Sequence, residues 1–105
     1  MITEYVLFDV DPAMTRDDVE QSMREIAPLW RDNPALIRKT FIFDPVASQG
    51  GAFYLWKSQE AARQAHGEAW RQRIVATYGG EPQIRYFETP VVVDNAVGEI
   101  VLSGD

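Results

Sequence analysis

The chain contains no cysteine and only one histidine, His66, among its 105 residues. The absence of cysteine excludes disulfides, thiolate zinc sites and thiol nucleophiles. A single histidine without a matched set of neighbouring ligands argues against a metal held by the protein. No glycine-rich loop leads from a strand into a helix in the pattern that binds a nucleotide. We therefore expect neither a metal nor a cofactor.

Basic residues and long apolar runs are also scarce. Ten lysines and arginines stand against sixteen acidic residues, which gives a net charge of -6 and argues against a nucleic-acid partner. No stretch approaches the roughly 18–20 apolar residues of a membrane span. The apolar N-terminal run lacks the basic segment and the cleavage site of a signal peptide. We expect a cytoplasmic protein with no nucleic-acid and no membrane partner.

Hydrophobic residues make up 46% of the chain, enough for one domain over residues 1–105. The apolar patterns predict strands at residues 2–10, 36–44, 52–56 and 83–88, and helices at about 15–30 and 59–78. The core is expected within residues 2–90. The tail, residues 91–105, is apolar but has no decisive period, and we expect an extended segment of undefined position.

Proline and glycine leave several boundaries open. Pro28 either ends the first helix near Ala27 or bends it and lets it continue to about Trp30, and the second alternative is favoured. Gly67 either lies within the second helix or divides it into two. The pair Gly50-Gly51 is expected to end the loop between the second and third strands.

The order β-α-β-β-α-β is that of a ferredoxin-like α+β fold, with an antiparallel sheet that carries both helices on one face. Alternation in the first and third strands places apolar side chains on both faces of this sheet. One set contains Tyr5, Leu7, Phe53 and Leu55, and the other contains Val6, Phe8, Tyr54 and Trp56. Two helices cover only one face, so we expect a second copy to cover the other in a homodimer.

Several segments carry a resemblance to known proteins. The run N-P-A-L-I-R-K over residues 33–39 is followed by Gly50-Gly51, by the triplet Tyr54-Leu55-Trp56 and by a helix start at Ser58. Over residues 3–90 this pattern resembles the small mono-oxygenase family typified by YdhR, although one extra residue separates the glycine pair from Tyr54. That family belongs to the dimeric α+β barrel superfamily of antibiotic biosynthesis mono-oxygenase-like proteins. The resemblance implies a dimer of ferredoxin-like subunits with a pocket between sheet and helices, but no established catalytic residue.

Two residues are candidates for catalysis. His66 is a candidate base near neutral pH, although an isolated helical histidine is more often structural. Arg38 and Lys39 point to opposite faces of one strand, so at least one of them enters an apolar layer and must be paired or face a pocket. Arg38 is the favoured candidate for orienting an acidic or phenolic ligand.

Tyr54, Trp56 and Trp70 are the candidate walls of a substrate pocket, although aromatic side chains at such positions more often fill a core. An apolar aromatic pocket with one proton-accepting group lets a phenol, hydroquinone or anthrone react directly with oxygen. We therefore expect a cofactor-independent mono-oxygenase that acts on a small aromatic molecule. Haem degradation, another activity of the superfamily, is disfavoured because the first strand lacks asparagine. The alternative is a non-catalytic homodimeric module that binds a small molecule or another protein.

Overall fold

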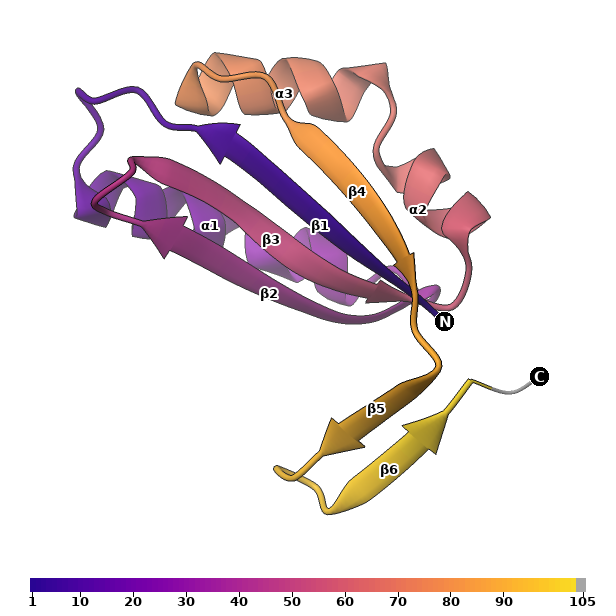
Figure 1. The fold of residues 1–105 in the computed structure, drawn as a ribbon. Coiled ribbons are helices and arrows are strands. Elements are labelled where there is room, and N and C mark those ends of the chain that lie inside the picture. The colour runs from indigo at the N-terminus through magenta and orange to yellow at the C-terminus, as the bar shows by residue number, and fades with distance from the viewer. Residues whose placement is uncertain (104–105) are drawn as a thin grey trace.

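The structure is a computed structural model that describes residues 1–103; residues 104 and 105 of the expected tail lie outside the described part. A four-stranded antiparallel sheet has the order β2-β3-β1-β4, and a two-stranded hairpin stands apart from it (Figure 1). The sheet consists of β1 (Ile2–Asp9), β2 (Leu36–Asp44), β3 (Gln49–Trp56) and β4 (Gln83–Glu88). The remaining elements are α1 (Arg16–Arg31), α2 (Gln59–Ala65), α3 (Glu68–Tyr78), β5 (Val91–Asp94) and β6 (Glu99–Leu102). The ferredoxin-like α+β fold expected from the sequence is confirmed.

The first helix starts at a capping box and passes through its proline. The amide of Asp18 donates to Thr15 Oγ1 at 3.1 Å, and the amide of Thr15 donates to Asp18 Oδ2 at 2.9 Å. Each side chain thereby satisfies an amide that the first helical turn leaves without a partner. The helix continues past Pro28 to Arg31, which confirms that the proline does not end it.

The second helical region is divided at Gly67. His66 is the C-terminal cap of α2, and Gly67 is the N-terminal cap of α3. At the far end, α3 ends at Tyr78, and its C-terminal cap is Gly79, whose φ of 93° lies in the left-handed region that favours glycine. The break leaves His66 at a helix end, from which its side chain enters the core. None of the helices within residues 1–103 is long and apolar enough to cross a membrane.

The glycine pair lies elsewhere than expected. β3 begins at Gln49, so Gly50 and Gly51 are part of the strand and do not end the loop. The chain turns before them, at residues 45–48, and Ser48 takes the positive φ of 54°. A Cβ added to Gly51 would lie 1.9 Å from the carbonyl oxygen of Val6. Glycine at this position therefore permits the close approach of β1 and β3.

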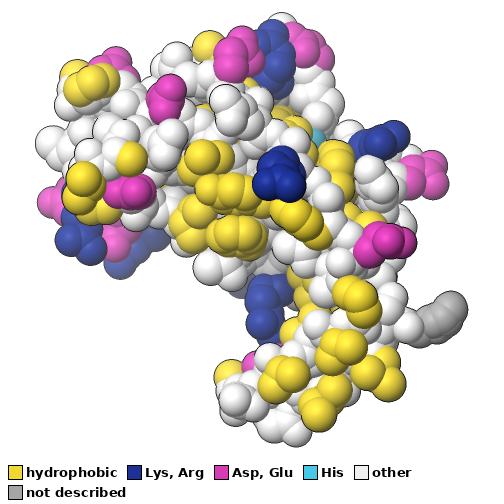
Figure 2. All heavy atoms as spheres, in the orientation of Figure 1, with side chains coloured by type: hydrophobic (Ala, Val, Ile, Leu, Met, Phe, Trp, Pro, Cys, Tyr) yellow, Lys and Arg dark blue, Asp and Glu magenta, His cyan; other side chains and the backbone are white. Residues whose placement is uncertain are grey.

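All three helices lie on one face of the sheet, called here the inner face (Figure 1). The outer face carries Tyr5 stacked on Phe53 with ring centroids 4.6 Å apart. Phe53 and Phe87 on this face are 44% and 41% exposed. Figure 2 shows apolar side chains gathered over the middle of the sheet on this side. The outer face is therefore both apolar and uncovered within the chain.

The tail forms a hairpin, β5–β6, called here the arm (residues 91–102). Main-chain hydrogen bonds hold its base: the amide of Thr89 donates to the Met1 carbonyl at 3.0 Å, and the amide of Ser103 donates to the Pro90 carbonyl at 2.9 Å. The arm leads away from the sheet (Figure 1) and most of its apolar side chains are exposed (Figure 2). The arm therefore does not cover the outer face.

We predict that Gly51→Ala lowers the free energy of unfolding by about 2–4 kcal/mol, because the new methyl group has no space between β1 and β3. Gly67→Ala is the matched control, since a Cβ there meets no atom within 4 Å, and its effect is expected to stay below about 1 kcal/mol. Urea unfolding of both variants measures the difference. Equal effects of the two substitutions would contradict the close approach.

Candidate functional site

A cavity of about 240 Å³ lies between the inner face of the sheet and helices α1 and α3. Its walls are mostly aromatic and aliphatic, and they include Met23, Trp30, Phe41, Tyr54, Trp70 and Ile74. Three residues with charged side chains also line it: Glu25 from α1, Lys39 from β2 and Arg73 from α3. An apolar pocket with a few convergent polar groups is the usual form of a small-molecule site.

A second hollow of about 460 Å³ lies between α1 and the β2 side of the sheet. Its charged side chains belong to Arg16, Glu20 and Arg24, all of which are exposed. Arg24 lies 3.7 Å from Glu20 in an exposed ion pair. Exposed charges of this kind have their ordinary solvation. The first cavity is the better candidate although it is smaller, because besides the exposed Glu25 and Arg73 it contains the partly buried Lys39.

Lys39 provides the amine of the first cavity. Its Nζ lies 4.0, 3.9 and 4.6 Å from the ring centroids of Trp30, Phe41 and Tyr54. Ring faces at these distances favour an ammonium ion. Burial and then the positive charge of Arg73 act in the opposite direction and lower the pKa of Lys39 to about 6. At neutral pH the larger part of this amine is therefore uncharged and able to accept a proton.

In the described part of the chain, the lysine has no carboxylate partner that would hold its charge. Among residues 1–103, Lys39 belongs to none of the ion pairs. The charge of Glu4 raises the pKa of Lys39, but less than burial and Arg73 lower it. Burial and the charge of Glu4 both raise the pKa of Tyr54, which remains a neutral phenol. The cavity thus holds an amine that can take a proton beside a phenol that keeps its own.

Behind the aromatic wall lies a fully buried polar cluster of Glu4, Trp56 and His66. Trp56 Nε1 donates to Glu4 Oε1 at 2.9 Å, and His66 Nδ1 lies 2.7 Å from Glu4 Oε2. The side chains of Glu4 and His66 have no exposed surface. In the described part of the chain, His66 Nε2 and Trp30 Nε1 have no hydrogen-bond partner. Trp56 and His66 of this cluster contact the rings of Tyr54 and Trp70, which line the cavity, on the side away from it.

The residues expected from the sequence are distributed over three places. Tyr54 and Trp70 line the cavity. His66 and Trp56 lie behind its wall, with the His66 ring 4.1 Å from that of Trp70. Arg38 lies on the outer face, where its side chain is half exposed and pairs with Asp94 of the arm. The structure therefore brings four of the five residues into one region and leaves Arg38 outside it.

Sequence reasoning missed two residues. The first is Lys39, since the sequence favours Arg38 as the ligand-orienting residue. Lys39 has the same parity along its strand as Phe41, and this alternation is the signal that places it on the inner face. Glu4 is the one charged residue among the inner-face positions of β1, which otherwise carry Ile2, Val6 and Phe8. A carboxylate inside such an apolar set must find a partner within the core.

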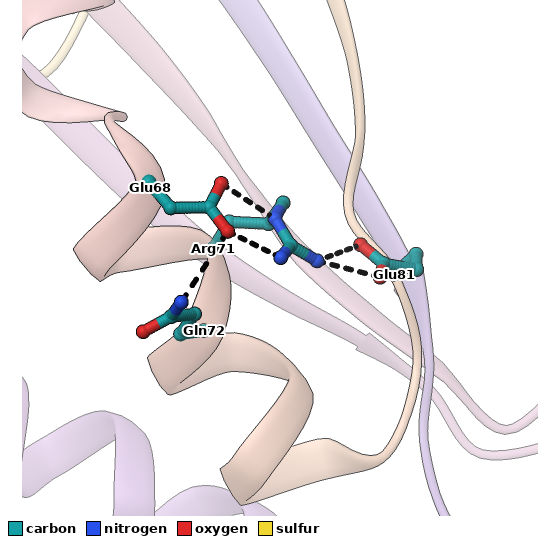
Figure 3. A network of polar contacts seen from close by, with 4 residues as sticks. All are labelled: Glu68, Arg71, Gln72 and Glu81. Carbon is teal, nitrogen blue, oxygen red and sulfur yellow. Dashed lines mark hydrogen bonds and ion pairs between the residues drawn. The ribbon is translucent and has the colours of Figure 1, made fainter.

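A surface network on α3 is unrelated to the cavity. Arg71 Nε donates to Glu68 Oε2 at 2.9 Å, Arg71 Nη1 donates to both oxygens of Glu81, and Gln72 donates to Glu68 (Figure 3). Hydrogen bonding to Arg71 lowers the pKa of Glu68. The network ties α3 to the segment before β4. Within residues 1–103, no group of three or more His, Cys, Asp or Glu side chains could hold a metal ion.

Comparison with known proteins supports the fold. No family model and no curated protein matches the chain. A Bordetella bronchiseptica protein named after the antibiotic biosynthesis monooxygenases has a TM-score of 0.66 at 18% identity, over 84% of this chain and 95% of the other. The ActVA-Orf6 monooxygenase of Streptomyces coelicolor, solved with nanaomycin D, has a TM-score of 0.65 at 19% identity, over 84% and 86%. SnoaB, a cofactor-independent oxygenase from Streptomyces nogalater, has a TM-score of 0.62 at 16% identity, over 84% and 91%.

These structures share the expected architecture with the chain. At such identities the likeness establishes the fold alone. The chain therefore has the fold of structures described as antibiotic biosynthesis monooxygenases, which is the fold that the resemblance in the sequence implies. The likeness does not bear on the narrower resemblance to the family typified by YdhR.

We predict that Glu4→Ala lowers the free energy of unfolding by about 3–5 kcal/mol, because it leaves His66 and Trp56 without their buried partner. Glu4→Gln keeps the shape and one acceptor, so its loss is expected to be about 1–2 kcal/mol. The control is Glu81→Ala in the exposed Arg71 network, which is expected to change stability by less than about 1 kcal/mol. Urea unfolding at pH 7 ranks the three variants. A Glu4→Ala effect as small as that of Glu81→Ala would show that the buried cluster is not formed.

Proposed function

We propose that the protein is a cofactor-independent mono-oxygenase that oxidises a small aromatic compound in the cavity between the sheet and the helices. The observation that carries this proposal is the Lys39 amine inside an aromatic cavity, with a pKa lowered to about 6 by burial and by Arg73. The likeness of the fold to an oxygenase described as cofactor-independent supports the same reaction class.

Lys39 supplies the one step that the reaction needs from the protein. The amine takes the proton of an electron-rich phenol and becomes an ammonium ion beside the phenolate. This charge then stabilises the anion. Oxygen attacks the electron-rich ring carbon: one oxygen atom enters the product as a carbonyl, and the other leaves as water. The phenol is oxidised to a quinone: it gives up the ring hydrogen and the phenolic hydrogen to the water and supplies all four electrons that reduce the two oxygen atoms, so no other reductant is required.

The volume of the cavity limits the size of the substrate. Its volume of about 240 Å³ lies below the range of about 300–1,000 Å³ that is typical of sites for drug-sized ligands. We infer a phenol or hydroquinone of one or two rings in preference to a three-ring anthrone. Tyr54 and Trp70 contact the substrate ring, whereas His66 and Trp56 position that wall from behind.

We also propose that the protein functions as a homodimer through the outer face of its sheet. Tyr5, Phe53 and Phe87 lie on this face, and neither the helices nor the arm cover them. Apolar patches of this kind mark interaction surfaces on soluble proteins. Two copies related by a twofold axis would bury the same patch on each. The arm adds further exposed apolar side chains beside it, including Val93, Ile100 and Leu102.

Oxygen uptake tests the proposed reaction. Metal-stripped protein given 1-naphthol and isotopically labelled oxygen is expected to consume oxygen above the spontaneous rate and to form equimolar 1,4-naphthoquinone that carries one labelled oxygen atom. Lys39→Met is expected to lower kcat by about 100-fold or more, whereas Lys57→Met at an exposed position leaves it unchanged. Because the uncharged amine is the active form, kcat/KM should rise with pH through about 6 and then level off. Binding of 1-naphthol without oxygen uptake would instead favour the non-catalytic binding module.

The mass in solution tests the dimer. We expect light scattering at micromolar concentration to give twice the chain mass of 11.9 kDa. Phe53→Glu, which places a charge in the middle of the outer face, is expected to shift the protein to the monomer mass. Leu29→Glu is the control, because Leu29 is 57% exposed on α1 and lies away from the outer face. A wild-type monomer at these concentrations would rule out the proposed interface.

A further inference from the structure

We propose that Lys39 is also a carbonyl-reactive lysine, which forms an imine with small aromatic aldehydes or ketones that enter the cavity. This inference does not depend on the oxygen chemistry, because it concerns bond formation by the amine itself. It assigns the cavity a second chemical class of ligand and Lys39 a second role.

The geometry of the cavity presents the amine to a flat ligand. Lys39 Nζ lies within 4.6 Å of the ring centroids of Trp30, Phe41 and Tyr54, and all four residues line the cavity. An aromatic aldehyde has one planar ring for these walls to contact and one carbonyl carbon for the amine to reach. Among the described residues no carboxylate forms an ion pair with Lys39, so no partner has to be displaced before it reacts.

The electrostatic surroundings favour the reactive form of the amine. Only an uncharged amine adds to a carbonyl, and a lysine becomes such a nucleophile when it is desolvated or placed beside another cation. Lys39 meets both conditions, since burial is the main cause of its lowered pKa and Arg73 of α3 is the second. Glu25 of α1, Tyr54 of β3 and Tyr78 of α3 are the other titratable groups that line the cavity. Glu4 of β1 acts on Lys39 only through its charge, which partly opposes the shift.

The reaction balances without a co-reactant. The nitrogen of Lys39 adds to the carbonyl carbon and gives a carbinolamine, with one amine proton transferred to the former carbonyl oxygen. Loss of water, which takes the second amine proton, then forms the carbon–nitrogen double bond. No electrons are gained or lost, and added hydride reagent converts the imine into a stable secondary amine that mass spectrometry detects.

The chain contains its own reference for this experiment. Lys39 and Lys57 are its only lysines. Lys57 is exposed and follows the end of β3, whereas Lys39 is inside the cavity. The ratio of the labelling rates of Lys39 and Lys57, measured in the same molecule, therefore shows how the cavity changes the reactivity of a lysine amine.

The test treats the folded protein with benzaldehyde and sodium cyanoborohydride at pH 6 to 7, followed by peptide mapping. We expect N-benzylation of Lys39 at least about tenfold faster than that of Lys57, because at this pH most exposed lysine amines are protonated. The Met1 amine is resolved as a separate peptide. An excess of toluene, which fills the cavity but cannot react, should slow Lys39 and leave Lys57 unaffected. Prior unfolding in urea should remove the difference.

The outcome is separable from that of the oxygen assay. Preferential labelling of Lys39 in a protein that consumes no oxygen would support the imine proposal and reject the proposed mono-oxygenase. Oxygen uptake with equal labelling of the two lysines in folded protein would do the reverse. Labelling of Lys39 that toluene does not slow would also overturn the imine proposal, because the reaction would then not occur in the cavity.

Discussion

The register of β2 is the constraint on which the site and the outer face both depend. The pairing of β2 with β3 is irregular between Leu36 and Arg38, and beyond this point Lys39 stands opposite Tyr54. Lys39 therefore faces the helices, and Arg38 faces the arm. Because side chains alternate along a strand, a shift by one residue would exchange these two charges. The cavity would then hold a guanidinium, which stays charged, instead of an amine that can lose its proton.

One row across the sheet contains four ionisable residues of the inner face. Lys39 pairs with Tyr54, Tyr54 pairs with Glu4, and Glu4 pairs with Tyr86, so the row crosses all four strands. The carboxylate in this row raises the pKa of Lys39 and of both tyrosines, although burial is the larger cause for the tyrosines. The neighbouring row on one side is entirely apolar and contains Phe41, Ala52, Val6 and Ile84.

Two residues of this row, Glu4 and Lys39, would carry a charge in water, and they avoid the free-energy cost of burying that charge in different ways. Glu4 keeps its place by accepting from Trp56 and pairing with His66, and breaking such a cluster leaves an uncompensated group in the core. Lys39 has no such partner among residues 1–103, and burial disfavours its charged form. Each unit by which the pKa falls corresponds to about 1.4 kcal/mol against the charged form of the amine. A buried ionisable group can therefore avoid this cost either by pairing, as Glu4 does, or by losing its charge, as Lys39 does. Only the second leaves a free group for a ligand.

The sequence was sufficient for the four-stranded sheet and the helices on one of its faces, because these rest on local signals, whereas it did not predict the β5–β6 hairpin. Alternation gave the strands, and the Thr15 and Ser58 caps gave the helix starts. The sequence could not decide between Arg38 and Lys39, because the irregularity before Arg38 depends on pairing with β3 and not on local preference. For the same reason the sequence did not show why residue 51 is a glycine. The space at this position is limited by the backbone of β1, which lies beside it in the sheet. The partner of Glu4 was likewise hidden, since His66 lies 62 residues further along the chain.

Alternation also couples the proposed interface to the proposed site. Phe53 on the outer face is the direct neighbour of Tyr54 in the cavity wall, and Arg38 is the direct neighbour of Lys39. Strand β2 is an edge strand that pairs with β3 alone, so a second copy packed on the outer face would restrict its motion. An isolated two-stranded hairpin is marginally stable in water, and contact with that copy would stabilise the arm as well. Because Asp94 of the arm pairs with Arg38 of β2, an arm held in place by the second copy would also restrict the motion of β2 at Arg38, the residue next to Lys39.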